Sequence, residues 1–153
     1  MKKLIGFCLG FAFVLSMSAQ SELVYNDGIY YDSENAVVEG QYHTYFKSGE
    51  KSATYELTEG VLNGKAIFYY ASGQKKEIGA YYNGDKDGLW IKWNSAGAKT
   101  AEANFRKGKK DGSWKVWDDN GQLRYETHNT NGERTGTWKM WNEKGELVSE
   151  KSY

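Results

Sequence analysis

The chain has 153 residues, with 20 Lys+Arg against 20 Asp+Glu, 18 Gly, no Pro and one Cys. A chain of this length predicts a single modest domain and excludes most multidomain enzymes. The balanced charge lacks the basic surface that neutralises several phosphates, so we do not expect nucleic acid as a partner. Its mean hydropathy of -0.76 excludes a polytopic membrane protein.

The first residues have the layout of a secretory signal peptide. Lys2 and Lys3 precede an apolar run over residues 4–15, and small residues follow up to Ala19. The run is shorter than the roughly 20 residues that a membrane-spanning helix needs, which disfavours a retained anchor. We therefore expect cleavage near Ala19 and a secreted or periplasmic protein. Cleavage also removes Cys8, the only cysteine, so the mature chain cannot form disulfides.

Glycine then recurs with a period of 24 residues, without any insertion or deletion. Three registers carry this period: Gly40, Gly64, Gly88, Gly112 and Gly136; Gly49, Gly73, Gly97, Gly121 and Gly145; and Gly60, Gly84, Gly108 and Gly132. All six tryptophans fall in two columns, two and five residues after the first glycine. The +2 column is Tyr42, Ala66, Trp90, Trp114 and Trp138, and the +5 column is Tyr45, Tyr69, Trp93, Trp117 and Trp141.

This period sets the domain organisation. We expect a signal peptide over residues 1–19 and a divergent N-terminal cap, a hairpin or strand, over residues 20–39. Five repeats then follow, over residues 40–63, 64–87, 88–111, 112–135 and 136–153.

Each repeat predicts two strands and two turns. Asx at the start and Gly at the end of residues 94–97, 118–121 and 142–145 are typical of a type I turn closed by a residue with positive φ. Asn83-Gly84 and Asn131-Gly132 favour tight hairpins. Glycines this frequent, each costing about 1 kcal/mol inside a helix, disfavour helix. The predicted fold is all-β: an elongated, twisted antiparallel β-meander of about ten strands, two from each hairpin repeat.

Two motifs resemble the MORN repeat, in its bacterial MORN-repeat-variant form. They are Gly-x-Trp-x-x-Trp-x-x-x-Gly over residues 112–121 and aromatic-x-x-Gly-x-Lys/Arg-x-Gly over residues 105–112. The resemblance covers residues 40–153 and departs at two positions, Ala66 for the first aromatic residue and Asn129 where other units have Tyr or Phe. It implies a twisted sheet that acts as a binding or scaffolding surface without chemistry of its own. Bacterial proteins of this kind are often labelled antitoxin components of toxin-antitoxin systems.

The aromatic columns supply the candidate partner- or glycan-binding residues. These are Trp90, Trp93, Trp114, Trp117, Trp138, Trp141, Tyr45 and Tyr69. Positions +2 and +5 differ by an odd number, so they point to opposite faces of an unbroken strand. Either a bulge turns both columns to one face, or the sheet curls and buries one column while it presents the other. Cross-strand stacking alone would explain both columns. An exposed column could instead stack on sugars, as in choline-binding repeats, a looser likeness through Phe68-Tyr69-Tyr70, or accept a protein.

No other pattern predicts chemistry. His43 and His128 lie in different units without a thiol, so we expect no metal and no cofactor. Asp118 falls in a turn column, which indicates turn chemistry rather than acid–base catalysis, and we expect no catalytic residue. The basic cluster of residues 106–110 lies beside Asp111 and is interpreted as solvated turn charge, so membrane lipid is not an expected partner.

The sequence therefore predicts an exported, non-enzymatic repeat protein that binds or scaffolds an unidentified protein partner at the cell envelope. Two alternatives stay open: binding of cell-wall or exopolysaccharide through the aromatic columns, and an antitoxin or immunity role.

Overall fold

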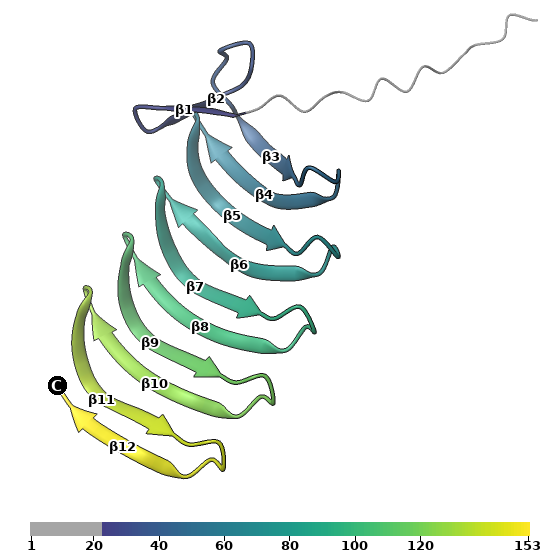
Figure 1. Cartoon of the computed structure of the whole chain (residues 1–153). Helices are drawn as coiled ribbons and strands as arrows, with labels where there is room; N and C mark the ends of the chain where they lie inside the picture. The colour runs from purple at the N-terminus through teal and green to yellow at the C-terminus, as the bar shows by residue number, and fades with distance from the viewer. Residues whose placement is uncertain (1–22) are drawn as a thin grey trace, which may run out of the picture.

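The structure, a computed structural model, describes residues 23–153, and the predicted signal peptide lies outside the described residues. All regular elements in this range are β-strands. β1 (Val24–Asn26) and β2 (Ile29–Tyr31) form a small two-stranded sheet, and the other ten strands form one antiparallel sheet in chain order (Figure 1). The predicted all-β meander of ten strands is confirmed.

The hairpins stack along one direction in Figure 1, each beside the previous one. The strands of the large sheet are β3 (Gly40–Tyr45), β4 (Lys51–Thr58), β5 (Val61–Tyr69), β6 (Lys75–Tyr82), β7 (Asp85–Trp93), β8 (Lys99–Arg106), β9 (Lys109–Trp117), β10 (Leu123–Thr130), β11 (Glu133–Trp141) and β12 (Leu147–Ser152). The described residues hold no helix of the length and apolarity that a membrane crossing requires.

Two kinds of turn alternate, as the glycine registers predict. At one end of the sheet the turns have two residues, and both have positive φ, for example Asn83 at 48° and Gly84 at 85°. This is the geometry of a type I′ hairpin, whose twist matches that of the strands. At the other end the Asn94 side chain accepts hydrogen bonds from the backbone N–H groups of Ala96 (3.1 Å) and Ala98 (3.0 Å), and Gly97 closes the turn with φ of 85°. Both turn predictions are confirmed.

A bulge at the first glycine of the repeat bends the odd-numbered strands. The sequence suggests short strands after this glycine, whereas β7 begins three residues before Gly88 and runs through it. Ile78 pairs with Ile91 and Ala80 with Asp87, so residues 88–90 face the single residue Gly79. The extra residues increase the local bend and twist of a strand, and the strands are visibly curved in Figure 1.

The +2 and +5 columns lie on opposite faces of the sheet. Each hairpin has a second register shift between its own two strands. In β7–β8 it lies between the pairs Lys92–Ala101 and Trp93–Lys99, so the extra residue is in β8. β7 itself is unbroken from Trp90 to Trp93. Side chains alternate along such a segment. We call the two sides the +2 face and the +5 face. The structure thus contradicts the alternative in which a bulge turns both columns to one face.

The N-terminal residues cover the turn between β4 and β5. The backbone N–H of Tyr30 donates to the Gly60 carbonyl (2.8 Å), and the Gly60 N–H donates to the Val38 carbonyl (2.9 Å). Tyr31 forms a bridge with Val37, just before β3. The β1–β2 hairpin therefore packs against the β4–β5 turn, while β3 remains the edge strand of the large sheet.

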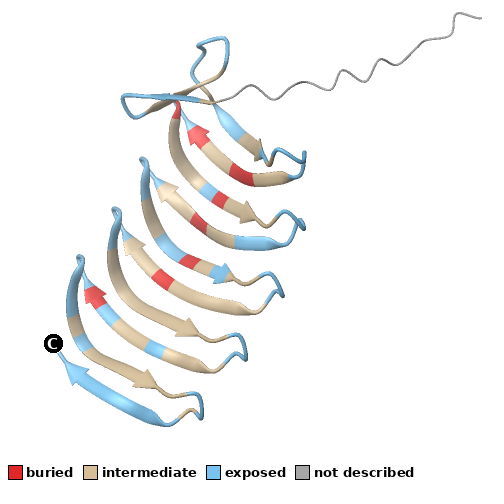
Figure 2. Cartoon of the chain, viewed as in Figure 1, coloured by how far each residue is buried: buried red, intermediate tan, exposed pale blue. Residues whose placement is uncertain are grey.

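The core is thin and asymmetric. The buried apolar residues of the described chain are Ala53, Leu57, Ala66, Trp90 and Ala103. All five lie on strands from β4 to β8. The last strand, β12, is exposed along its whole length (Figure 2). A single sheet has no second layer, so each hairpin is stabilised mainly by its neighbours.

Candidate binding surface

Trp90 is the centre of an aromatic cluster on the +2 face. It is 2% exposed, and its ring centroid lies 5.1 Å from that of Tyr81, 6.3 Å from Phe68 and 6.4 Å from Phe105. The indole also lies against the backbone of Gly79, where an added Cβ would overlap the ring. These contacts make Trp90 a packing residue, although the sequence predicts it as a partner contact as well.

The tyrosines of this cluster are shielded from water. Burial raises the pKa of Tyr55, and it raises the pKa of Tyr81 to about 12. Burial also raises the pKa of Tyr30 in the N-terminal cap. The first half of the +2 face is therefore filled by its own aromatic side chains.

The second half of the +2 face has a groove. The column that places Tyr81 and Phe105 beside Trp90 continues to Asn129, which is much smaller than an aromatic ring. A groove of about 200 Å³ lies there between Trp114 and Trp138. Its lining is mostly apolar and consists of Lys110, Trp114, Val116, Tyr125, Thr127, Asn129 and Trp138. We call this the Asn129 groove.

One wall of the groove has an unused hydrogen-bond donor. The Nε1–H of Trp90 donates to the Ala80 carbonyl (3.1 Å), and that of Trp138 donates to the His128 carbonyl (2.9 Å). The corresponding Nε1 of Trp114 is buried and has no acceptor among the described residues. A buried donor without a partner costs about 1–3 kcal/mol of stability.

Each tryptophan of the +2 column is covered by a cation four residues earlier. Lys86 Nζ lies 3.6 Å from the Trp90 ring centroid, and Lys110 Nζ lies 3.4 Å from that of Trp114. The Arg134 guanidinium lies 4.6 Å from the Trp138 ring centroid. Partial burial against the indole lowers the pKa of Lys110. The groove is thus an apolar slot with positive charge at its rim.

The aromatic side chains of the +5 column are mostly half-buried, so they do not form a fully exposed aromatic surface. Trp93, Trp117 and Trp141 are half-buried, Tyr69 is half-buried and Tyr45 is 45% exposed. Lys99 Nζ lies 4.2 Å from the Trp117 ring centroid and 2.7 Å from Glu102 Oε1, which places all three side chains on this face.

A register-aligned row of residues crosses the +5 face beside these aromatics. Its first part is apolar, with Ile67, Ile78 and Ile91 paired in succession. Its second part alternates in charge, in the order Glu102, Lys115, Glu126, Lys139 and Glu150, each paired with the next. We call these five residues the charge row. Lys115 Nζ lies 3.2 Å from Glu126 Oε1 within it.

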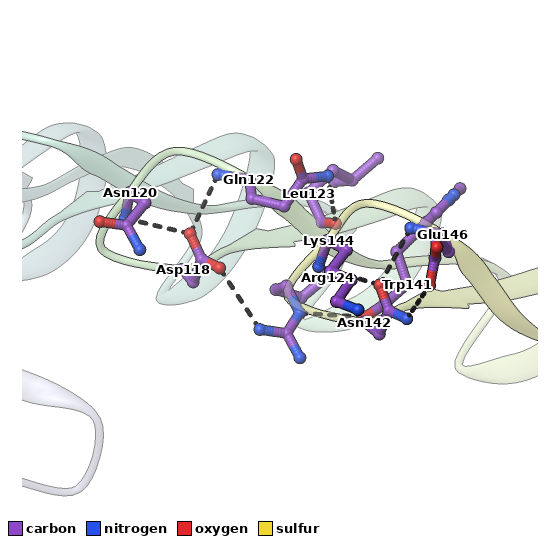
Figure 3. Close-up of polar contacts among 9 residues, drawn as sticks. All are labelled: Asp118, Asn120, Gln122, Leu123, Arg124, Trp141, Asn142, Lys144 and Glu146. Atoms are coloured by element: carbon purple, nitrogen blue, oxygen red, sulfur yellow. Dashed lines mark hydrogen bonds and ion pairs between the residues drawn. The ribbon is translucent and has the colours of Figure 1, made fainter.

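The carboxylates singled out by the sequence serve the turns. Asp118 Oδ1 accepts hydrogen bonds from the backbone N–H groups of Asn120 and Gln122, both at 3.0 Å, and Oδ2 lies 3.3 Å from Arg124 (Figure 3). Arg124 Nε in turn donates to the Trp141 carbonyl (2.9 Å) and so joins neighbouring hairpins. These contacts match the predicted turn role.

A second, open hollow of about 360 Å³ lies between β9, β10 and β11. Its lining consists of Ser113, Glu126, Thr127, His128, Gly136 and Thr137. Ser113 and His128 are paired across β9 and β10, and Asn104 Nδ2 donates to the Ser113 carbonyl (3.2 Å). Within residues 23–153 no cluster of three potential metal ligands is found.

The structure brings together only some of the predicted site residues. Trp114 and Trp138 share the Asn129 groove, whereas Trp90 is buried and the +5 tryptophans lie on the other face. Sequence reasoning missed Tyr125 and Lys110 as lining residues. Asn129 was visible as a departure from the aromatic column, and that is the signal that could have located the groove.

An open sheet of stacked hairpins is the architecture of a β-repeat protein. The MORN repeat variant model matches residues 62–83, 110–129 and 134–153, which correspond to the hairpins β5–β6, β9–β10 and β11–β12. Three stretches of the chain thus match the MORN repeat variant family, and the predicted resemblance is confirmed. MORN repeats are generally protein- or lipid-binding motifs.

No curated protein matches this chain significantly. Two solved structures share local geometry with it. One is the GtfA/B complex bound to UDP and GlcNAc, at 12% identity and a TM-score of 0.29, over 86% of this chain and 24% of that chain. The other is a Staphylococcus aureus TarM mutant in complex with fondaparinux, alpha-GlcNAc-glycerol and UDP, at 10% identity and a TM-score of 0.38, over 76% of this chain and 21% of that chain. This chain therefore spans less than a quarter of the length of either.

Proposed function

We propose that this protein is an exported, non-enzymatic MORN repeat protein that binds or scaffolds a protein partner at the cell envelope, with the Asn129 groove as its principal contact. The apolar run and small residues before Ala19 support export. The observation that carries the binding role is the interruption of the aromatic column at Asn129, which leaves the space between Trp114 and Trp138 unfilled.

The groove suits an apolar or aromatic side chain of a partner. Trp114 and Trp138 form its walls, and the 45%-exposed Tyr125 lies on its lining. Buried aromatic residues in such slots dominate the affinity of most protein interfaces. Lys110 on the groove lining favours a partner segment with a carboxylate next to its anchoring side chain.

The test is capture of partners from an envelope extract by the folded mature protein. Three variants are compared with the wild type: Asn129→Tyr, which fills the groove; Trp138→Ala, which removes one wall; and Tyr82→Ala, which removes a 58%-exposed aromatic residue outside the groove. We expect a protein captured by the wild type and by Tyr82→Ala and lost from the two groove variants. Equal capture by wild type and Asn129→Tyr, or no capture by any of them, contradicts the proposal.

Polysaccharide binding is the second candidate function, and one observation favours it. The indoles of Trp114 and Trp138 line the groove together and offer aromatic faces on which a sugar ring could stack. Titration of the wild type and Asn129→Tyr with a panel of cell-wall and exopolysaccharides, followed by tryptophan emission, distinguishes it. A shift in the wild type that is absent in Asn129→Tyr supports a glycan ligand, and no shift with any glycan eliminates this candidate. No observation favours the antitoxin role, and we do not propose it.

A further inference from the structure

We propose that the β9–β12 part of the +2 face binds an acidic segment of a partner protein, whose carboxylates reach Lys110, Arg134 and Lys151. This inference rests on the proposed function and names the chemistry of its partner, because these three cations surround the Asn129 groove.

The first step is that the +2 face carries an excess of positive charge. Residues paired across neighbouring strands lie on the same face, so the register identifies the side chains of each face. The whole chain has as many acidic as basic residues, and the excess is therefore local to this face. The charged strand residues on the +2 face, within the described chain, are five cations and one carboxylate: Lys86, Lys92, Lys110, Arg134, Lys151 and Glu77.

The second step is that the cations of the second half have no carboxylate partner. Glu77 lies on β6, where its carboxylate is 3.1 Å from Lys86 Nζ and 3.6 Å from Lys92 Nζ. None of the ion pairs of the described chain involves Lys110, Arg134 or Lys151. The second half of the +2 face is thus positive and uncompensated, which attracts and orients an acidic partner.

The third step is that aromatic rings hold these cations on the face. In addition to its contact with Trp138, the Arg134 guanidinium lies 5.4 Å from the Tyr153 ring centroid, and its Nη1 donates to the Tyr153 hydroxyl (3.1 Å). Lys151 Nζ lies 4.8 Å from the same ring centroid. A cation on an aromatic ring keeps its charge and its other N–H donors, so two cations beside one ring form a site for a carboxylate.

The fourth step is that the cations border the groove within the reach of one short segment. Lys110 lines the groove, Arg134 is paired with Asn129, and Lys151 is paired with Trp138. They lie on β9, β11 and β12, so about 15 Å separates the first from the last across the sheet. An extended peptide rises about 3.4 Å per residue, and about five residues span this distance.

A protein segment fits this surface better than a membrane or an acidic polysaccharide. The buried apolar residues of the described chain all belong to the +2 face, which indicates that this face is the inner side of the bent sheet. A flat membrane cannot follow an inner surface. The groove lining is mostly apolar, so it accepts an apolar side chain of a peptide at lower cost than the hydroxyl groups of a sugar.

A second copy of this chain does not supply the acidic segment. Two +2 faces would bring like charges together, and the charge row of the +5 face has lysines between its glutamates. In the turn of residues 118–121, Asp118 contacts Arg124, and Asp119 accepts a hydrogen bond from Asn94 Nδ2 (2.9 Å). The carboxylates must therefore come from a different protein.

The test starts from a phage-displayed library of random peptides, selected on the folded wild-type protein at low salt. We expect the selected peptides to carry an excess of aspartate and glutamate beside an apolar or aromatic residue. One selected peptide is then labelled with fluorescein, and its affinity is measured by anisotropy for the wild type and for three cation variants: Lys110→Glu, Arg134→Glu and Lys151→Glu.

Lys75→Glu is the matched control. Lys75 is exposed and is paired with Tyr69 on the +5 face, so this variant has the same change of charge on the opposite face. Circular dichroism checks that every variant is folded. Lys110→Gln, Arg134→Gln and Lys151→Gln, which remove the charge without reversing it, replace any reversal variant that does not fold.

We expect each cation variant to bind the peptide about 3- to 30-fold more weakly than the wild type, because the reversal turns an attraction into a repulsion. Lys75→Glu should bind as the wild type does, and added salt should weaken wild-type binding. Selected peptides without an acidic excess, or equal affinities for the wild type and all cation variants, would overturn the proposal. Binding of phosphatidylglycerol vesicles or of alginate by the wild type, without binding of acidic peptides, would overturn the assignment to a protein.

Asn129→Tyr separates this inference from the proposed function. Acidic peptides that bind Asn129→Tyr as tightly as the wild type, but bind the cation variants weakly, would support the basic surface and contradict the groove. Selected peptides without an acidic excess that lose binding only to Asn129→Tyr would support the groove and contradict this inference.

Discussion

A difference at one repeat position gives tryptophans at equivalent positions different surroundings. Trp90 and Trp138 hold the same position in their units, yet Trp90 is surrounded by Phe68, Tyr81 and Phe105, while Trp138 has one aromatic neighbour in the described chain, Tyr153 at 5.1 Å. The difference follows from Asn129, which replaces the ring that would lie between Trp114 and Trp138. The same residue type is therefore structural in one hairpin and available for binding in another.

This contrast predicts unequal losses of stability. Trp90→Ala removes a side chain that is 2% exposed and should lower the free energy of unfolding by about 3–5 kcal/mol. Trp138→Ala removes a partly exposed ring at the groove and should cost about 1–2 kcal/mol. Urea unfolding of both variants measures the difference, and equal losses would show that the two environments are alike.

The shielded tyrosines predict a loss of stability in alkali. The folded-state pKa of Tyr81 is about 12, above its ordinary value of 10.0, so folding favours the protonated phenol. Its contribution is fully present below pH 10 and is lost as the pH rises towards 12, because the unfolded chain ionises first. Tyr81→Phe has no such proton, so its stability should fall less over that window. Urea unfolding below pH 10 and near pH 12 tests this, and parallel losses in both proteins would refute it.

At the scale of the hairpin, the turns are where sequence and backbone agree most closely. Asn83 and Asn131 stand at positions with φ of 48° and 51°, and Lys107 has the same φ of 48° without the side chain that tolerates it. Asparagine adopts this left-handed conformation at lower cost than lysine. The turn at Lys107 is therefore less favourable than those at Asn83 and Asn131, and so is the turn at Glu59, whose φ is 50°.

Lys107→Asn should consequently stabilise the protein by about 0.3–1 kcal/mol. The measurement is the midpoint of thermal unfolding, with Lys109→Asn, a substitution in the strand next to the turn, as the control. A lower midpoint for Lys107→Asn would mean that the lysine side chain makes a contact more important than backbone strain.

The repeat period, the all-β fold and both turn types could be predicted from the sequence, because glycine and Asx residues favour particular backbone conformations in turns. The bulge at Gly88 and the extra residue in β8 could not, since they depend on how β7 pairs with both neighbours. For the same reason the sequence left two alternatives for the aromatic columns. The groove could not be predicted either. Its position depends on which side chain of one strand packs beside a ring of the neighbouring strand, and the spacing of columns along the chain does not give this cross-strand packing.

At the scale of the whole molecule, the sheet is a one-dimensional stack of hairpins with the N-terminal cap against its first turn. The cap covers the first hairpin, the first half of the +2 face is filled with aromatic rings, and the second half carries the groove and the exposed strand β12. Contacts are made between adjacent hairpins, so stability should be close to a sum over neighbours.

Removal of one complete repeat should therefore leave a folded protein. Deletion of residues 88–111 preserves the period of 24 residues and the alternation of odd and even strands. We expect a β-rich circular dichroism spectrum and a lower midpoint of unfolding, because the Trp90 cluster is lost. An unfolded deletion variant would contradict the independence of the hairpins.

The most direct test of the groove is thermal unfolding of Asn129→Tyr beside the wild type. If the space between Trp114 and Trp138 is open, a tyrosine fills it, makes aromatic contacts worth about 0.5–1.5 kcal/mol and raises the midpoint by about 2–6 °C. If the space is already filled, the larger side chain overpacks the +2 face and the midpoint falls. A lower midpoint would thus show that no open groove exists between Trp114 and Trp138, and would contradict the binding function proposed for it.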